Sequence, residues 1–383
     1  MYDGHICEHG HELPRAEDLP DIGTLLERQI RKVYEEKLLA GDIDADTWRH
    51  NTTQLWKGIQ EGWKKAPLFA SKAQLSLLEL RRNVNVYAAF KNHSNVIELT
   101  QLLTGPGGEK LTFGQFKKLA KPLTEKYNQT WLRTEYDYAT KSARAAAQWD
   151  TFKERGGKLQ YMTIGDGRVR EAHVALEGTI LPVDAPFWKM YYPPNGWNCR
   201  CFVRWRPDDT ETIAPQSVPD VNGMFLNNVG ETSQIFTDDH PFIRQISEAQ
   251  ADLIRQIAQQ ETLRWERTYL RPLLKEGLVG KSTQVQIGEI TASVRYSSRR
   301  LKEALNQPHI QQFEKNRAML GIDTLLKGAT YVQTVPNIKQ IKNNVKQYHY
   351  LLTEIAGQPS YIVLEEMVDG KIFFHTIVDA LKE

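Results

Sequence analysis

Apolar residues recur near helical spacing along most of the first 157 residues. In residues 21–41 this pattern ends at Gly41, and glycine is common just after the C-terminus of a helix. We therefore expect a mainly helical portion over residues 21–157, preceded by an N-terminal arm over residues 1–20.

The clearest helix prediction covers residues 131–157. Ala139, Ala143 and Ala147 lie four residues apart, so they fall on one face of the helix. Their small side chains predict a flat surface that another element can approach closely. Gly156 marks the expected end of the helix.

From residue 158 the pattern changes to short strand-like segments separated by Gly, Pro and Asp. It predicts a small, irregular β-containing core with its tail over residues 158–245 and a helical linker over residues 246–280. Residues 281–383 read as a separate α+β module that closes on a hairpin turning at Asp369 and Gly370. The predicted fold class is therefore α+β.

Composition restricts the class of protein. Hydrophobic residues make up 40% and charged residues 25% of the chain, as in soluble globular proteins. The formal charge of +2 argues against a strong general affinity for nucleic acid. The sequence contains no apolar run long enough to span a membrane and begins without a secretory-signal pattern, so we expect no membrane partner. Three cysteines fit folding in a reducing cytoplasm.

Two of these cysteines, Cys199 and Cys201, are separated by one residue. In an extended chain this spacing puts both sulfur atoms on one side, where they are suited to bind one metal ion, with His173 as a third ligand. Zinc is the candidate ion if a metal binds there. The candidates for a fourth ligand are Asp166, Asp184 and His240.

Two other interpretations of the cysteine pair stay open. The thiols pack as small apolar groups under Trp197 and Trp205, or they carry redox or nucleophilic chemistry. The N-terminal stretch HICEHGH, residues 5–11, raises the same question, since its His and Cys residues are either metal ligands or a chance cluster in an arm.

Residues 165–201 resemble the core of the phage Mu F-like minor head proteins, a head morphogenesis family of tailed phages and prophages. Similarity to the family extends over about residues 25–245 and is strongest over residues 131–201. The structural motif that carries the resemblance comprises Asp166, Arg168, His173, Trp188, Pro193, Pro194, Trp197, Cys199 and Cys201.

The resemblance implies a minor head protein associated with the portal and the capsid interior, acting in head assembly or DNA delivery. The implied partners are the portal protein, other head proteins and packaged DNA. The implied location is the virion, with the host cytoplasm during assembly. It implies no enzymatic activity for this part of the chain, and it fits a structural role for Cys199, Cys201 and His173, with or without zinc.

The C-terminal module, residues 281–383, resembles phage-associated nuclease domains of the barnase, colicin and RelE type. Metal-independent RNA cleavage needs an acid, a base and cations near the scissile phosphate. His349, His375 and Lys342 are the candidate catalytic residues. The alternative function is therefore a virion-carried effector that cleaves host RNA. Two ordinary histidines and a solvated basic helix face would explain the same residues.

Overall fold

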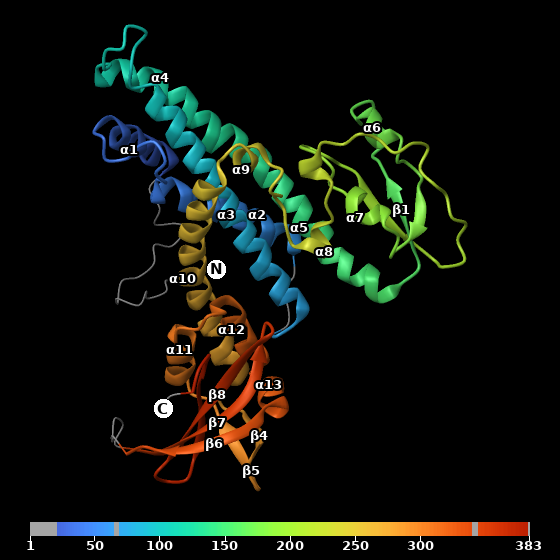
Figure 1. Ribbon diagram of the computed structural model, residues 1–383. Helices are drawn as coiled ribbons and strands as arrows, with labels where there is room; N and C mark the ends of the chain where they lie inside the picture. The colour runs from blue at the N-terminus through green and yellow to red at the C-terminus, as the bar shows by residue number, and fades with distance from the viewer. Residues whose placement is uncertain (1–20, 65–68, 339–343, 382–383) are drawn as a thin grey trace. The chain divides into compact units, whose positions relative to one another are not determined.

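The computed structural model describes residues 21–64, 69–338 and 344–381 (Figure 1). The expected arm over residues 1–20 and the HICEHGH stretch lie outside these ranges. By their contacts, the described residues divide into two compact units. The first unit contains residues 21–64 and 76–259, and the second contains residues 69–75 and the chain from residue 260 onward. The helix that contains the division at residue 259 covers most of the predicted linker.

Helices dominate the first part of the chain, as predicted. The elements are α1 (Ile22–Tyr34), α2 (Ala45–Trp63), α3 (Lys72–Gln101), α4 (Phe113–Glu125), a π-helical turn (Lys126–Trp131) and α5 (Leu132–Arg155). The predicted helix over residues 131–157 is confirmed as α5, and Gly156 follows it with a φ of 67°, a conformation that glycine adopts without strain.

The predicted close approach to the alanine face of α5 is also confirmed. Helix α2 packs against α5, where Ala139 and Ala143 are fully buried and Ala147 is partly buried. On α2, a Cβ atom added to Gly62 would lie 2.0 Å from the carbonyl oxygen of Thr140 on α5. The two helix backbones are thus so close that no side chain larger than that of glycine fits at position 62.

Helices α3 and α5 also share a buried polar contact. The Lys91 ammonium lies 2.5 Å from the Glu135 carboxylate, and the Tyr87 hydroxyl donates a 2.8 Å hydrogen bond to the same carboxylate. All three side chains are buried. Removing one partner of such a pair costs about 3–5 kcal/mol, because the remaining charge is left buried without compensation.

The small β unit, residues 158–206, follows the C-terminal end of α5 (Figure 1). Its strands form an antiparallel sheet in the order β2-β1-β3, which confirms the predicted strand-like segments. Its elements are β1 (Lys158–Met162), α6 (Glu171–Val174), β2 (Ile180–Pro182), α7 (Phe187–Tyr191) and β3 (Phe202–Arg206).

An aromatic cluster joins the chain after α7 to the long helices. The Trp197 ring lies 5.1 Å from that of Tyr138 on α5 and 5.2 Å from that of Phe225. The ring of Phe236 stacks on Tyr87 of α3 at 3.7 Å. The elements that follow β3 are η2 (Gly223–Phe225), α8 (Val229–Thr232), α9 (Pro241–Arg244) and α10 (Glu248–Leu278).

The C-terminal sheet has six strands in the order β4-β5-β9-β8-β7-β6. Among the described strands of this sheet only β5 and β9 pair in parallel, which makes the sheet mixed and, together with the helices, confirms the α+β class. The predicted hairpin is confirmed as β8 and β9, and Gly370 in its turn has a φ of 80°. The elements are β4 (Ser282–Ile287), β5 (Ile290–Arg295), α11 (Ser298–Asn306), α12 (Gln312–Ala318), η3 (Met319–Gly321), α13 (Ile322–Gly328), β6 (Thr330–Pro336), β7 (Val345–Ile355), β8 (Gln358–Met367) and β9 (Ile372–Val378).

None of the helices in the three described ranges combines the length and the apolar character needed to cross a bilayer.

Candidate metal centre

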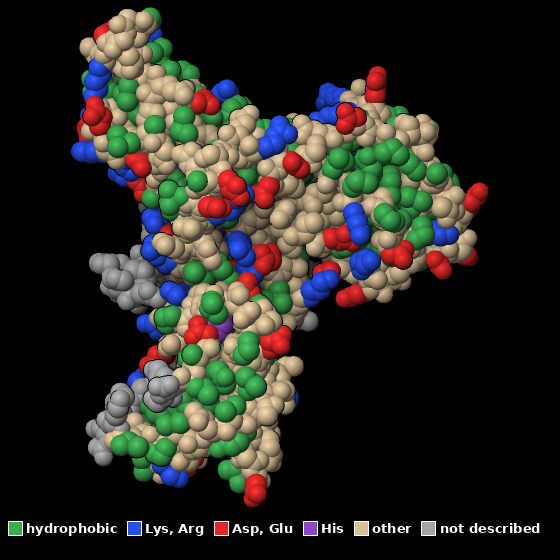
Figure 2. Space-filling model, viewed as in Figure 1, with side chains coloured by type: hydrophobic (Ala, Val, Ile, Leu, Met, Phe, Trp, Pro, Cys, Tyr) green, Lys and Arg blue, Asp and Glu red, His purple; other side chains and the backbone are tan. Residues whose placement is uncertain are grey.

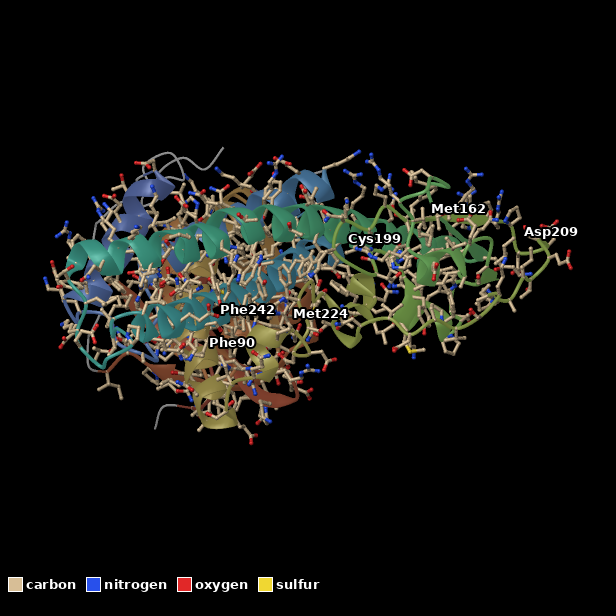
Figure 3. The ribbon with its side chains drawn as sticks, turned by 90° about the horizontal axis from the view of Figure 1, so that it is seen from above. Phe90, Met162, Cys199, Asp209, Met224 and Phe242 are labelled. Atoms are coloured by element: carbon tan, nitrogen blue, oxygen red, sulfur yellow. The ribbon has the colours of Figure 1, made fainter. Side chains whose placement is uncertain are left out.

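The cysteine pair lies on a tight turn that leads into β3. The backbone N–H of Cys199 donates a 3.1 Å hydrogen bond to the carbonyl of Gly196, and Asn198 adopts a left-handed conformation with a φ of 58°. Asparagine tolerates this conformation better than most residues. In Figure 3, Cys199 lies between the long helices and the distant loop that carries Asp209.

The structure brings His173 to both cysteines. The Nδ1 atom of His173, on α6, lies 3.7 Å from the Cys199 sulfur and 3.4 Å from the Cys201 sulfur. The ligand atoms of the three residues all lie within 4.8 Å of one another. His173 and Cys199 are almost fully buried, and Cys201 is half-buried. Both cysteines are free thiols. The fold therefore brings the predicted ligands together, although His173 precedes Cys199 by 26 residues and Cys201 by 28 residues.

The pKa values of the two thiols are shifted in opposite directions. A hydrogen bond from Cys201 is the largest cause that lowers the pKa of Cys199, to about 4, with His173 and the backbone N–H groups of Cys201 and Asn195 assisting against burial. The same contact with Cys199, followed by burial, raises the pKa of Cys201.

Tyr161 on β1 completes the surroundings and is a residue that the sequence motif did not reveal. Its side chain is fully buried, its hydroxyl hydrogen-bonds to the Cys201 sulfur, and it lies 3.4 Å from the Asn195 amide oxygen. Burial, followed by the nearby Cys201 and Cys199, raises the pKa of Tyr161, so its hydroxyl keeps its proton and can donate to a thiolate.

The segment around Asp166 is tied to the cysteine turn by charge. Both oxygens of the Asp166 carboxylate accept hydrogen bonds of 2.6 Å from the Arg200 guanidinium, and Arg170 donates to the carbonyl of Trp197. The Arg200 contact holds the pKa of Asp166 below its usual value. The bidentate pair fixes Arg200, the residue between the two cysteines, on the outside of the turn.

The three candidates for a fourth ligand do not join the cluster. Asp166 is paired with Arg200, and Asp184 is exposed. His240 accepts a hydrogen bond from the backbone N–H of Phe242 at the start of α9, and burial lowers its pKa to about 4. Among the described residues, the group of convergent His, Cys, Asp and Glu side chains is limited to His173, Cys199 and Cys201.

The remaining motif residues are not part of the ligand cluster. Trp188 is fully buried and donates a 2.9 Å hydrogen bond to the carbonyl of Pro182, and a cis peptide bond joins the buried Pro193 and Pro194. Arg168 is exposed.

The aromatic contacts of Trp197 and Trp205 are not with the cysteines. Trp197 packs on Tyr138 and Phe225, and Trp205 packs under the Arg155 guanidinium. The ring and cation contacts of the two tryptophans are thus made with the helices and the aromatic cluster.

A pocket of about 340 Å³ adjoins the cysteines. Lys141 and Arg144 of α5 contribute to its wall, together with Tyr192, Cys199, Cys201 and Phe202. Both cationic side chains lie more than 50 residues before Cys199 in the chain, so no local sequence pattern links them to the cysteines.

In the C-terminal sheet, the two candidate catalytic histidines are not brought together. His349 on β7 is paired in register with Leu364 of β8, which in turn is paired with Phe374 of β9. His375 follows Phe374 and contacts Glu365, the neighbour of Leu364. The register of β8 and β9 shifts at His375, whose ring lies 6.3 Å from that of Tyr348, the residue before His349 on β7. Because successive residues of β7 point to opposite faces, His349 and His375 lie on opposite faces of the sheet.

Each of these histidines has its own carboxylate. The nitrogen atoms of His349 lie 2.8 Å from the Thr334 hydroxyl and 3.0 Å from the Glu366 carboxylate. His375 lies 3.5 Å from Glu365, a buried residue that also accepts a 2.6 Å hydrogen bond from Arg300. Sequence reasoning did not single out either glutamate. Lys342, the third candidate, lies outside the described residues.

The comparisons with known proteins divide the chain at a similar place. Residues 99–204 match the family model described as "Phage Mu protein F like protein". Residues 261–374 match the model "Large polyvalent protein-associated domain 3". The resemblance of the C-terminal module to nuclease domains is not part of these matches and stays a prediction.

Two curated relatives match a shorter stretch of the chain. The "Mu-like prophage FluMu F protein" of Haemophilus influenzae is 41% identical over 75 residues, which are 20% of this chain and 18% of the relative. The "Putative capsid assembly protein F" of Escherichia phage Mu is 38% identical over 76 residues, which are 19% of this chain and 17% of the relative. The chain thus matches less than a fifth of the length of either relative. No solved structure gives a significant match. Residues 99–204 therefore form a phage Mu F-like domain.

Proposed function

We propose that this protein acts in the head morphogenesis of a tailed phage or prophage, as a minor component that binds the portal protein and lies in the capsid interior. The observation that carries the proposal is the Mu F-like domain, whose matched relatives include a protein named as a putative capsid assembly protein. The proposed partners are the portal, other head proteins and the packaged DNA. The proposed work is head assembly or DNA delivery.

The surface of the small β unit and its tail supports a role in protein contacts. Large apolar side chains are exposed there, and Val218 is 69% exposed. The others are Ile164, Val174, Met190, Phe202 and Ile213. Figure 2 shows hydrophobic side chains gathered over this part of the molecule. Exposed apolar surface of this kind marks protein interaction sites. We assign the head-protein contact to residues 158–245 and the support of that surface to the helical portion, residues 21–157.

The proposal is tested in the phage or prophage that encodes the chain. Deleting the gene should sharply reduce infectious particles and complete heads while tails still form, because the missing protein belongs to head assembly. A tagged chain supplied in trans should restore the titre and co-purify with heads. Normal titres and complete heads after deletion would contradict the proposal.

A surface variant tests the assigned contact. Val218→Asp with Met190→Asp puts charges on the exposed apolar surface and should reduce incorporation of the folded chain into heads. Lys189→Asp, at an exposed neighbouring position, is the matched control, because it changes the net charge by the same two units without removing apolar surface. Equal incorporation of both variants would move the contact away from residues 158–245.

A further inference from the structure

The geometry of His173, Cys199 and Cys201 matches the requirements of one particular ion. In tetrahedral zinc sites the Zn–S distance is about 2.3 Å and the Zn–N distance about 2.0–2.1 Å, so a ligand nitrogen and sulfur lie about 3.6 Å apart. The Nδ1 atom of His173 lies 3.7 Å and 3.4 Å from the two sulfur atoms. All three ligand atoms thus lie where a single zinc ion could contact each of them.

Hydrogen bonding alone does not explain this arrangement as well. A neutral imidazole has at Nδ1 either one proton to donate or one lone pair to accept with. That atom nevertheless lies at nearly the same distance from two sulfur atoms. A metal ion placed between the three atoms would be bound by all of them at once.

A disulfide between the two cysteines is opposed by the chain around them. Only Arg200 separates the cysteines, and its side chain is held outside the turn by the bidentate contact with Asp166. Besides their contacts with each other and with His173, the sulfur atoms have separate neighbours, since backbone N–H groups approach Cys199 and the Tyr161 hydroxyl approaches Cys201. Donors of this kind also surround metal-bound thiolates and orient them.

We propose that His173, Cys199 and Cys201 bind one zinc ion, with an exchangeable non-protein ligand such as water in the fourth position. Two thiolates and an imidazole favour zinc over magnesium or calcium, which prefer oxygen ligands. The ion would join α6 to the start of β3 in a unit whose strands have only three to five residues. A sheet this small gains from an added cross-link, because binding free energy at such a site contributes to folding.

The first experiment measures metal on the full chain. The protein is produced with added zinc, purified under reducing and oxygen-free conditions, and its zinc content is determined. We expect one equivalent in the wild type and its loss in Cys199→Ser and His173→Ala. Cys7→Ser is the matched control: it makes the same chemical change in the HICEHGH stretch and should leave the zinc in place. A metal-free wild type, or a Cys199→Ser variant that retains its zinc, would overturn the proposal.

The second experiment does not depend on variants that fold. Zinc is removed from the wild type with a chelator and Co²⁺ is added in its place. We expect the intense ligand-field bands of four-coordinate cobalt together with thiolate-to-cobalt charge transfer. Adding azide should shift the ligand-field bands, since it would replace the exchangeable ligand. A spectrum without charge transfer would refute binding by the cysteines. Bands that azide leaves unchanged would refute the exchangeable fourth position. Both outcomes are independent of head assembly.

Discussion

Two buried histidines in this molecule have opposite surroundings. His173 lies in an irregular segment between short strands and faces two thiols at 3.7 Å and 3.4 Å. His349 lies in the middle of a six-stranded sheet and has a hydroxyl at one ring nitrogen and a carboxylate at the other. The first arrangement directs three ligand atoms toward one point. The second provides hydrogen-bond partners for both ring nitrogens of a buried side chain.

The difference follows from backbone regularity. In the C-terminal sheet, alternation along β7 sends His349 to the face opposite Tyr348, beside which His375 lies, and β8 separates their two strands. In the small β unit, the turn before β3 and the short helix α6 carry the ligands, so no such alternation separates His173 from the cysteines. Functional groups converge more readily from loops and element ends than from adjacent positions of a regular sheet.

The largest effect that sharpens this contrast is expected for His349→Ala. The substitution removes two hydrogen bonds from a residue that is 3% exposed and leaves a cavity, so it should cost about 2–4 kcal/mol. Hydrogen exchange of the β7 amides in the full chain measures the loss. If exchange is unchanged while an RNA-cleaving activity of the wild type disappears, His349 is a catalytic rather than a structural residue.

A smaller effect is expected from pH. Burial lowers the pKa of His349 below its ordinary value of 6.5, although Glu366 opposes the shift. The unfolded chain therefore binds a proton at higher pH than the folded chain does, and stability falls as the pH drops through 6.5 toward the lower pKa of the folded state. Hydrogen exchange across this range should show the loss, and His349→Gln should flatten it. An equal slope in the variant would assign the pH dependence to other groups.

The smallest effect is expected for His375→Ala. The residue is partly exposed and lies 3.5 Å from Glu365, which keeps its ion pair with Arg300, so the free energy of unfolding should change by less than about 1 kcal/mol. Arg300→Met serves as the contrasting variant, because it deprives the buried Glu365 of its closest cation and should destabilise the sheet more strongly. A larger cost for His375→Ala than for Arg300→Met would reverse the assignment.

Individual helices and strands were easier to predict from the sequence than the contacts between them. Helix α5 followed from its alanine spacing and Gly156, and the hairpin of β8 and β9 followed from Asp369 and Gly370, because these signals are local. The ligand set of His173 and the two cysteines was also proposed from sequence.

The wider surroundings of that site could not be predicted. Tyr161 reaches Cys201 through the pairing of β1 with β3, and Asp166 has Arg200 as its partner rather than a metal. The separation of His349 from His375 depends on β8 lying between their strands, and strand order is a property of the whole sheet.

The contact between α2 and α5 bears on modularity. The family match begins at residue 99, whereas α2 spans Ala45–Trp63. Yet α2 packs on α5 so closely that a Cβ atom at position 62 would lie 2.0 Å from the carbonyl oxygen of Thr140. The segment that matches the Mu F-like family is thus not expected to fold independently of α2. Anyone who transplants it into another protein, or excises it for study, must carry α2 along with it.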